Sequence, residues 1–146
     1  MLVIDANVLV YAADDSAREQ SDCRRVLVEC HGGRTPWYLT WGIVYEFLRV
    51  VTHPRVLRRP RDVTEAWGFV AALLASPSNA VLVATPRHQE VAARFVDDHR
   101  GILSGNLLHD AHTVALMMEH GVSRIVTRDA DFHRFGGIEV IDPLSG

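Results

Sequence analysis

Short apolar runs alternate with longer amphipathic stretches along the chain, and polar, glycine or proline residues separate them. The apolar runs predict short buried strands, and the amphipathic stretches predict helices. We expect strands at residues 2–4, 37–39, 81–84, 125–127 and 139–141. We expect helices at about residues 16–30, 40–52, 62–75, 85–99 and 106–120. This alternation predicts an α/β fold in which a parallel sheet is covered by helices on both faces.

Residues at the ends of the predicted helices support these boundaries. Thr40 can cap one helix, and Pro54 stops it. Thr85 followed by Pro86 is typical of an N-cap and a first helical position, and Gly121 is typical of a helix end. The chain has 146 residues and is 48% hydrophobic. That length and composition predict one domain over residues 1–146 with its own core.

The chain shows no sign of export or membrane insertion. Its apolar runs are far shorter than the roughly 20 residues that span a bilayer, and its first five residues lack the pattern of a signal peptide. We therefore expect a cytoplasmic protein. Cys23 and Cys30 are seven residues apart on one predicted helix. That spacing separates their Cα atoms by about 10 Å, too far for a disulfide, so we expect free thiols.

Four acidic residues lie in apolar surroundings. Asp5 ends one apolar strand and Asp129 follows another, while Glu46 and Asp110 interrupt apolar helices. A buried ionised acid must be paired or must coordinate a cation. Ligands of open parallel sheets bind beyond the carboxyl ends of the strands, which is where Asp5 and Asp129 lie. We expect the four carboxylates to converge on one metal site.

The chemistry of such a site follows from its ligands. Several carboxylates within a few ångströms repel one another unless a cation neutralises them. Oxygen ligands select Mg²⁺ or Mn²⁺, and both ions engage phosphate groups of substrates. An ion of this kind activates water and neutralises the leaving oxygen. The acidic residues therefore predict phosphodiester hydrolysis.

The charge distribution is compatible with a polyanionic substrate. The formal net charge is −3, from 18 acidic and 15 basic residues. If four acids hold metal, the remaining 14 face 15 basic residues, which leaves +1. All the basic residues are arginines, and four of them lie close together, namely Arg55, Arg58, Arg59 and Arg61. Guanidinium groups suit phosphate, although a solvated loop explains the run equally well.

Four local motifs occur in order along nearly the whole chain. They are VIDANVLVYA at residues 3–12, YEFLR at residues 45–49, NLLHDA at residues 106–111 and TRDADF at residues 127–132. Together they closely resemble the PIN-domain ribonucleases, and in particular the VapC toxins of bacterial toxin–antitoxin pairs. The resemblance implies a PIN-like three-layer sandwich with a central, mostly parallel sheet.

The resemblance also implies an activity and partners. PIN-domain toxins of this group are RNA endonucleases that depend on Mg²⁺ or Mn²⁺ and inhibit translation by cleaving structured RNA, tRNA or rRNA. They form homodimers, and a VapB antitoxin neutralises them. We expect the same of this chain.

Individual residues match the motifs of that family. Its acidic quartet corresponds to Asp5, Glu46, Asp110 and Asp129. We expect Asp5 to ligate the principal metal ion and Asp110 and Asp129 to complete its shell. Glu46 would support a second ion or orient the attacking water.

Three further polar residues accompany the quartet. Asn7 matches the polar neighbour of the first acid, and Thr127 matches the hydroxyl before the last. We expect both to hydrogen-bond the ligands from behind. Asp131 either joins the site or caps the local backbone.

Two other interpretations stay open at this point. His109, Asp110 and His112 resemble the metal-binding residues of HD-type phosphohydrolases, whose fold is all-helical; the predicted strands oppose this. A second possibility is a non-catalytic domain that sequesters RNA or an antitoxin and uses its acids as a negative pocket for an arginine. Loss of RNA cleavage on Asp5→Asn would distinguish catalysis from sequestration.

Overall fold

The computed structural model describes residues 1–145 and consists of a five-stranded parallel sheet between two layers of helices. The strand order is β3-β2-β1-β4-β5. The strands are β1 (Leu2–Ile4), β2 (Trp37–Thr40), β3 (Asn79–Leu82), β4 (Arg124–Val126) and β5 (Glu139–Ile141). All four strand pairs are parallel. The predicted three-layer α/β sandwich is confirmed, and the parallel sheet excludes the all-helical alternative.

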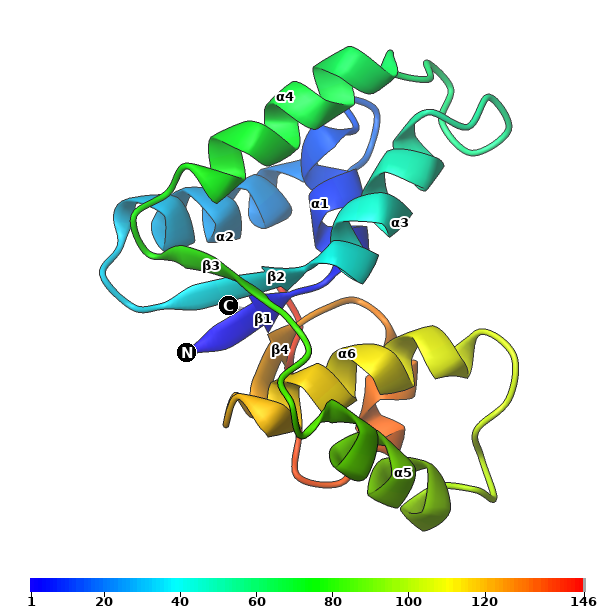
Figure 1. Cartoon of the computed structure of the whole chain (residues 1–146). Helices are drawn as coiled ribbons and strands as arrows, with labels where there is room; N and C mark the ends of the chain where they lie inside the picture. The colour runs from blue at the N-terminus through cyan, green and yellow to red at the C-terminus, as the bar shows by residue number, and fades with distance from the viewer. Residues whose placement is uncertain (146) are drawn as a thin grey trace.

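Helices α1 to α4 lie on one side of the sheet, and α5 and α6 lie on the other (Figure 1). The helices are α1 (Ala6–Ala13), α2 (Gln20–Gly32), α3 (Trp41–Val51), α4 (Val63–Leu74), α5 (His88–Asp98) and α6 (Leu107–Glu119). A short 3₁₀ helix, η1 (Ala130–Arg134), follows β4. None of the helices in residues 1–145 is long and apolar enough to cross a membrane.

The central strands are buried on both faces, which is why they are almost wholly apolar. Val3, Ile4 and Ile125 have no accessible surface. Strands in this position must be hydrophobic on both sides because helices cover both faces of a parallel sheet. The largest side chains without accessible surface include Trp37, which belongs to β2, and Phe47, which belongs to α3.

Several elements differ from those expected, and α2, for example, starts at Gln20 instead of at about residue 16. Helix α1 was not predicted, because its eight residues include three β-branched or polar positions and no clear apolar stripe. Strand β3 starts and ends two residues earlier than expected. The polar turn expected between β4 and β5 contains η1. By contrast, Thr40 caps α3 as predicted, since its Oγ1 accepts a hydrogen bond from the Ile43 N–H at 3.0 Å.

Helix α5 begins at His88, three residues after Thr85, and Thr85 Oγ1 accepts a hydrogen bond from the Arg87 N–H at 3.1 Å. The Thr85 backbone N–H and its Oγ1 both donate hydrogen bonds to Glu119 Oε2, each at 2.9 Å. The other carboxylate oxygen of Glu119 bonds the His88 ring. The Glu119 side chain is only 1% exposed and lies near the end of α6. Glu119 therefore ties the start of α5 to α6, the helix that carries Asp110.

Glu119 is ionised in this setting. Burial raises the pKa of Glu119, but the hydrogen bonds from the Thr85 backbone, His88 and the Thr85 hydroxyl outweigh it, so the pKa lies below its usual value. An ionised carboxylate can only accept hydrogen bonds, so the bonded Nδ1 of His88 carries the proton.

The two cysteines behave as expected from their spacing. Cys23 and Cys30 both lie on α2, and both are free thiols. Burial raises the pKa of Cys23 to about 11, so this thiol stays protonated at neutral pH and is inert.

Replacement of Glu119 by alanine should destabilise the protein by about 1–3 kcal/mol, because it leaves the half-buried Thr85 N–H and hydroxyl without this acceptor. Chemical denaturation of the metal-free protein measures this loss. Glu90→Ala is the matched control, since Glu90 lies on the exposed face of α5 and contacts Arg87 only at 3.8 Å. An equal loss in both variants would contradict the role assigned to Glu119.

Candidate metal centre at the carboxyl edge of the sheet

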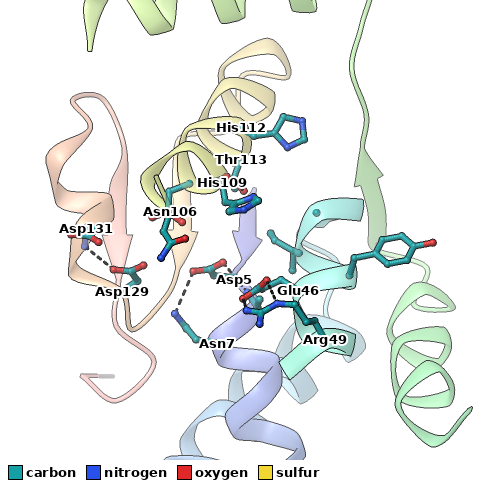
Figure 2. A pocket seen from close by; sticks show the side chains of 15 residues that line it. Asp5, Asn7, Glu46, Arg49, Asn106, His109, His112, Thr113, Asp129 and Asp131 are labelled. Carbon is teal, nitrogen blue, oxygen red and sulfur yellow. Dashed lines mark hydrogen bonds and ion pairs between the residues drawn. The ribbon is translucent and has the colours of Figure 1, made fainter. Parts of the chain in front are cut away.

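A cleft of about 890 Å³ opens at the carboxyl ends of β1 and β4. Its walls come from α1, α3, α6 and the segment around η1, so residues far apart in the sequence face one another there (Figure 2). Five carboxylates line it: Asp5, Glu46, Asp110, Asp129 and Asp131. The structure thus brings all four predicted acids to one cleft, together with Asp131.

Asp5 is held by a buried network at the base of the cleft. It is the N-cap of α1, where its Oδ1 accepts a hydrogen bond from the Ala6 N–H at 2.8 Å. Thr127 Oγ1 donates to Asp5 Oδ2 at 2.7 Å, and Asn7 Nδ2 donates to the same oxygen at 3.3 Å. These bonds hold the carboxylate in one orientation before any ligand arrives.

Thr127 joins the two central strands at this point. Its hydroxyl proton goes to Asp5, while its oxygen accepts hydrogen bonds from Asn7 Nδ2 and the Asp129 N–H, both at 3.0 Å. Asn7 Oδ1 in turn accepts from the Arg128 N–H at 3.1 Å. The structure thus contains hydrogen bonds from both Asn7 and Thr127 to Asp5, and their role in supporting metal ligands stays a prediction.

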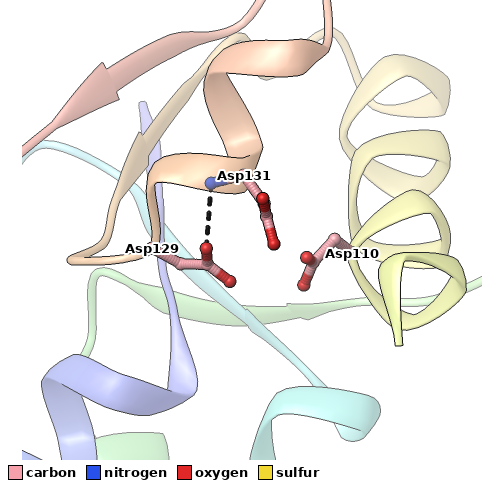
Figure 3. A group of neighbouring side chains, drawn as sticks. All are labelled: Asp110, Asp129 and Asp131. Carbon is pink, nitrogen blue, oxygen red and sulfur yellow. Dashed lines mark hydrogen bonds between the residues drawn. The ribbon is translucent and has the colours of Figure 1, made fainter. Parts of the chain in front are cut away.

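Three further carboxylates form a compact group beside Asp5. Asp110 from α6 faces Asp129 and Asp131, which flank the start of η1 (Figure 3). Each offers an oxygen within 4.8 Å of the others. Asp129 Oδ1 accepts from the Asp131 N–H at 2.9 Å, so Asp129 is the residue that caps η1. The Asp131 carboxylate does not cap the backbone there, and it lies within the group.

The electrostatics of this group favour a bound cation. Burial, together with the charges of Asp129, Asp5, Asp131 and Glu46, raises the pKa of Asp110 to about 7. Burial likewise raises the pKa of Asp5, against the hydrogen bonds from Thr127 and Ala6. Within residues 1–145, no arginine forms an ion pair with either carboxylate. An oxygen-only, mutually repelling donor set fits a hard divalent cation.

Glu46 differs from the other four acids because it is exposed and paired. Its side chain is 46% exposed, and both of its oxygens accept hydrogen bonds from Arg49 one turn later on α3. The expected apolar setting of Glu46 is wrong. Its neighbours Val44 and Phe47 point into the core, whereas Glu46 faces the cleft.

The cleft also contains residues that the sequence did not single out as part of the site. Arg49, Tyr45 and Asn106 all line the cleft. The YEFLR motif already contained the evidence for Arg49. It follows Glu46 by three residues, and one turn of a helix brings side chains at that spacing together.

His109 and His112 also lie on the α6 wall (Figure 2). Among the described residues, neither belongs to a group of three side chains close enough to share a metal ion. The His112 ring instead packs edge-on against His88, with centroids 5.8 Å apart.

The arginine run between α3 and α4 does not line the cleft. Arg55, Arg58 and Arg59 are exposed, whereas Arg61 is half-buried. Arg61 Nε donates a hydrogen bond to the Ala13 carbonyl at 3.0 Å, which anchors the segment to the end of α1. A contact with RNA outside the cleft stays a prediction for the three exposed arginines.

Comparison with known proteins identifies the family. The sequence model of the PIN-domain family matches residues 2–138 of this chain. Ribonuclease VapC43 of Mycobacterium tuberculosis is 34% identical over 146 residues, which cover 100% of this chain and 97% of that protein. Ribonuclease VapC48 of the same species is 32% identical over 142 residues, 97% of each chain. The chain therefore belongs to the PIN-domain family and, within it, to the VapC group.

Solved structures agree on the fold. VapC20 of Mycobacterium tuberculosis, described as a toxin that cleaves the sarcin–ricin loop, superposes with a TM-score of 0.68 at 18% identity, covering 97% of this chain and 100% of that one. VapBC2 of Rickettsia felis, solved with a DNA fragment from its promoter, superposes with a TM-score of 0.68 at 12% identity, covering 95% and 96%. At these identities the similarity shows a common fold.

Substitution of Asp110 by asparagine should stabilise the metal-free protein at pH 8. The raised pKa of Asp110 means that the folded state favours the protonated form, so its contribution to stability is present at low pH and is lost as the pH rises through about 7. Removing the charge should recover on the order of 1 kcal/mol, after allowing for solvent at a half-buried site.

Thermal unfolding with a chelator at pH 5 and pH 8 measures this effect. Asp98→Asn, at an exposed position of α5, is the control for general charge effects. With Mn²⁺ at pH 8 the order should reverse, since wild type gains stability from the ion and Asp110→Asn gains little. The same pH dependence in wild type and Asp110→Asn would contradict the assignment.

Proposed function

We propose that this protein is a metal-dependent RNA endonuclease and the toxin of a VapBC-type pair that inhibits translation by cleaving structured RNA, tRNA or rRNA. The observation that carries the proposal is the convergence of five carboxylates from four separate segments on one cleft. The PIN-domain family and the names of the VapC relatives support it.

Asp5, Asp110 and Asp129 are the residues that would hold Mg²⁺ or Mn²⁺, with Asp131 beside them. When bound, such an ion activates water and offsets the negative charge that develops at the phosphate. Asp5 is kept in place by Thr127 and Asn7, so its free oxygen positions face the cleft. Glu46, on the opposite wall, would support a second ion or accept a proton from the attacking water.

An antitoxin of the VapB type is the partner that we propose. Solved relatives include the VapBC-1 complex of nontypeable Haemophilus influenzae and the FitAB complex bound to DNA. A negative cleft of this kind can accept a cationic side chain of a partner, which would block substrate and metal together. Homodimer formation and a cytoplasmic location stay predictions from the sequence.

Asp5→Asn should abolish RNA cleavage. Asparagine keeps the shape of the side chain but loses the charge that binds the ion, so we expect the rate with Mn²⁺ to fall at least about 100-fold, beyond the loss typical of residues behind the ligands. Purified wild type and variant are compared on total cellular RNA, and mapping of new RNA ends identifies the cut site.

Asp98→Asn is the matched control for loss of one acidic charge. Cleavage by Asp5→Asn at the wild-type rate would refute catalysis by this cleft. Toxicity on expression that persists in Asp5→Asn, without cleavage, would favour the alternative in which the protein sequesters RNA or a partner.

Thr127→Val should weaken Mn²⁺ binding by about 10–100-fold, the range found for residues that orient ligands. Valine has nearly the same shape but cannot donate to Asp5 or accept from Asn7 and the Asp129 N–H. Isothermal titration with Mn²⁺ measures the change. Thr127→Ser keeps the hydroxyl and should bind Mn²⁺ as wild type does; equal weakening in both variants would contradict the role assigned to the hydroxyl.

A further inference from the structure

The cleft has one permanently positive side chain among the described residues that line it. Arg49 faces five carboxylates, and the remaining polar residues of the lining are neutral or titratable. RNA carries a negative charge on every nucleotide, so the cleft without metal repels the substrate class that the proposed function assigns to it. Whether the metal-free cleft presents a free positive charge to a phosphate group therefore depends on the interactions of Arg49.

In this structure Arg49 is fully engaged by Glu46. Arg49 Nη2 donates to Glu46 Oε1 at 2.7 Å, and Arg49 Nε donates to Glu46 Oε2 at 3.1 Å. This is a bidentate guanidinium–carboxylate pair, and it uses both oxygens of Glu46. A Glu46 carboxylate held in this way cannot also present both oxygens to a metal ion.

The geometry differs from the other arginine pairs at the same spacing. Arg100 approaches Asp97 through a single contact at 3.5 Å, Arg25 approaches Asp22 through one at 3.4 Å, and Arg87 approaches Glu90 through one at 3.8 Å. These six partners lie outside the lining of the cleft. Within residues 1–145, only the Arg49 pair at this spacing combines two hydrogen bonds with a position in the cleft.

The Arg49 pair can be broken at little cost. The Arg49 side chain is 63% exposed and that of Glu46 is 46% exposed. Exposed ion pairs are weak because water competes for both groups. The guanidinium fork that fits a carboxylate also fits a phosphate, so Arg49 can change partner without losing hydrogen bonds.

We infer that Arg49 is a phosphate-binding residue that Glu46 withholds from RNA until Glu46 turns to a metal ion. The inference rests on the proposed function and extends it. Arg49 pairs with Glu46 in the metal-free cleft and is released to the RNA backbone when Glu46 becomes a ligand. Metal and RNA then bind cooperatively, and each raises the affinity for the other by the same factor.

The first test measures RNA binding without cleavage. A fluorescein-labelled, single-stranded RNA decamer of random sequence is titrated by anisotropy, once with a chelator and once with Ca²⁺, and a gel checks that the RNA stays intact. Glu46→Gln frees Arg49 without metal, so its affinity in chelator should exceed that of wild type. Asp131→Asn is the matched control, because it removes one negative charge from the same cleft but has no arginine partner.

We expect Glu46→Gln to bind the decamer about threefold to tenfold more tightly than Asp131→Asn does, the order expected of one charged hydrogen-bonded contact near water. In the double variant Glu46→Gln with Arg49→Gln this advantage should disappear. Equal affinities of Glu46→Gln and Asp131→Asn, or an advantage that persists without Arg49, would overturn the inference.

The second test measures metal binding alone. Arg49→Gln removes the competitor for Glu46, so isothermal titration with Mn²⁺ should show tighter binding by about threefold. Arg100→Gln, which breaks the pair with Asp97 at the end of α5, should bind as wild type does. Unchanged Mn²⁺ affinity in Arg49→Gln would also overturn the inference. Neither test measures cleavage: a wild type that does not cut RNA refutes the proposed function, whereas a wild type that cuts RNA but shows none of these differences refutes only the exchange by Arg49.

Discussion

Repulsion between carboxylates held a few ångströms apart is the constraint on which this structure depends. Asp110, Asp129 and Asp131 face one another, and Asp5 lies beside them at the base of the same cleft. Burial and mutual repulsion raise the pKa of Asp110 to about 7. A chain that folded only for stability would disperse these charges, because each one opposes the ionisation of its neighbours. The folded state nevertheless keeps them together, and the cation that we propose would relieve their repulsion.

The rest of the fold supplies the rigidity that this repulsion requires. Strands β1 and β4 are neighbours, and the hydroxyl of Thr127 spans the gap between them to reach Asp5. Asp129 caps η1 and thereby sets its own orientation. Glu119, on the far end of α6, ties that helix to α5. Hydrogen bonds to ionised or buried groups are among the stronger ones in proteins, so the carboxylates cannot relax apart.

Much of this arrangement could be predicted from local patterns, and the exceptions have identifiable causes. Helices α3, α4 and α6 end close to where their caps and apolar periods place them, because those signals are local. Helix α1 lacks a distinct apolar stripe, so its period could not be read. Thr85 was expected to cap α5; its hydroxyl accepts from the Arg87 N–H before the helix starts, and it also donates to the Glu119 carboxylate, 34 residues away. No local pattern contains that contact.

The acidic residues show the same division. Sequence motifs were sufficient to select Asp5, Glu46, Asp110 and Asp129, and the parallel α/β pattern was sufficient to place strand ends at a common edge. The sequence alone thus determined the fold class, the family resemblance and the four acids of the site. Only the tertiary structure decided that Asp131 joins the group, that Arg49 holds Glu46 in the cleft, and that the arginine run lies elsewhere. The reason is physical: which side chains meet depends on how separate elements pack and turn against one another, and local residue patterns specify the elements but not those angles.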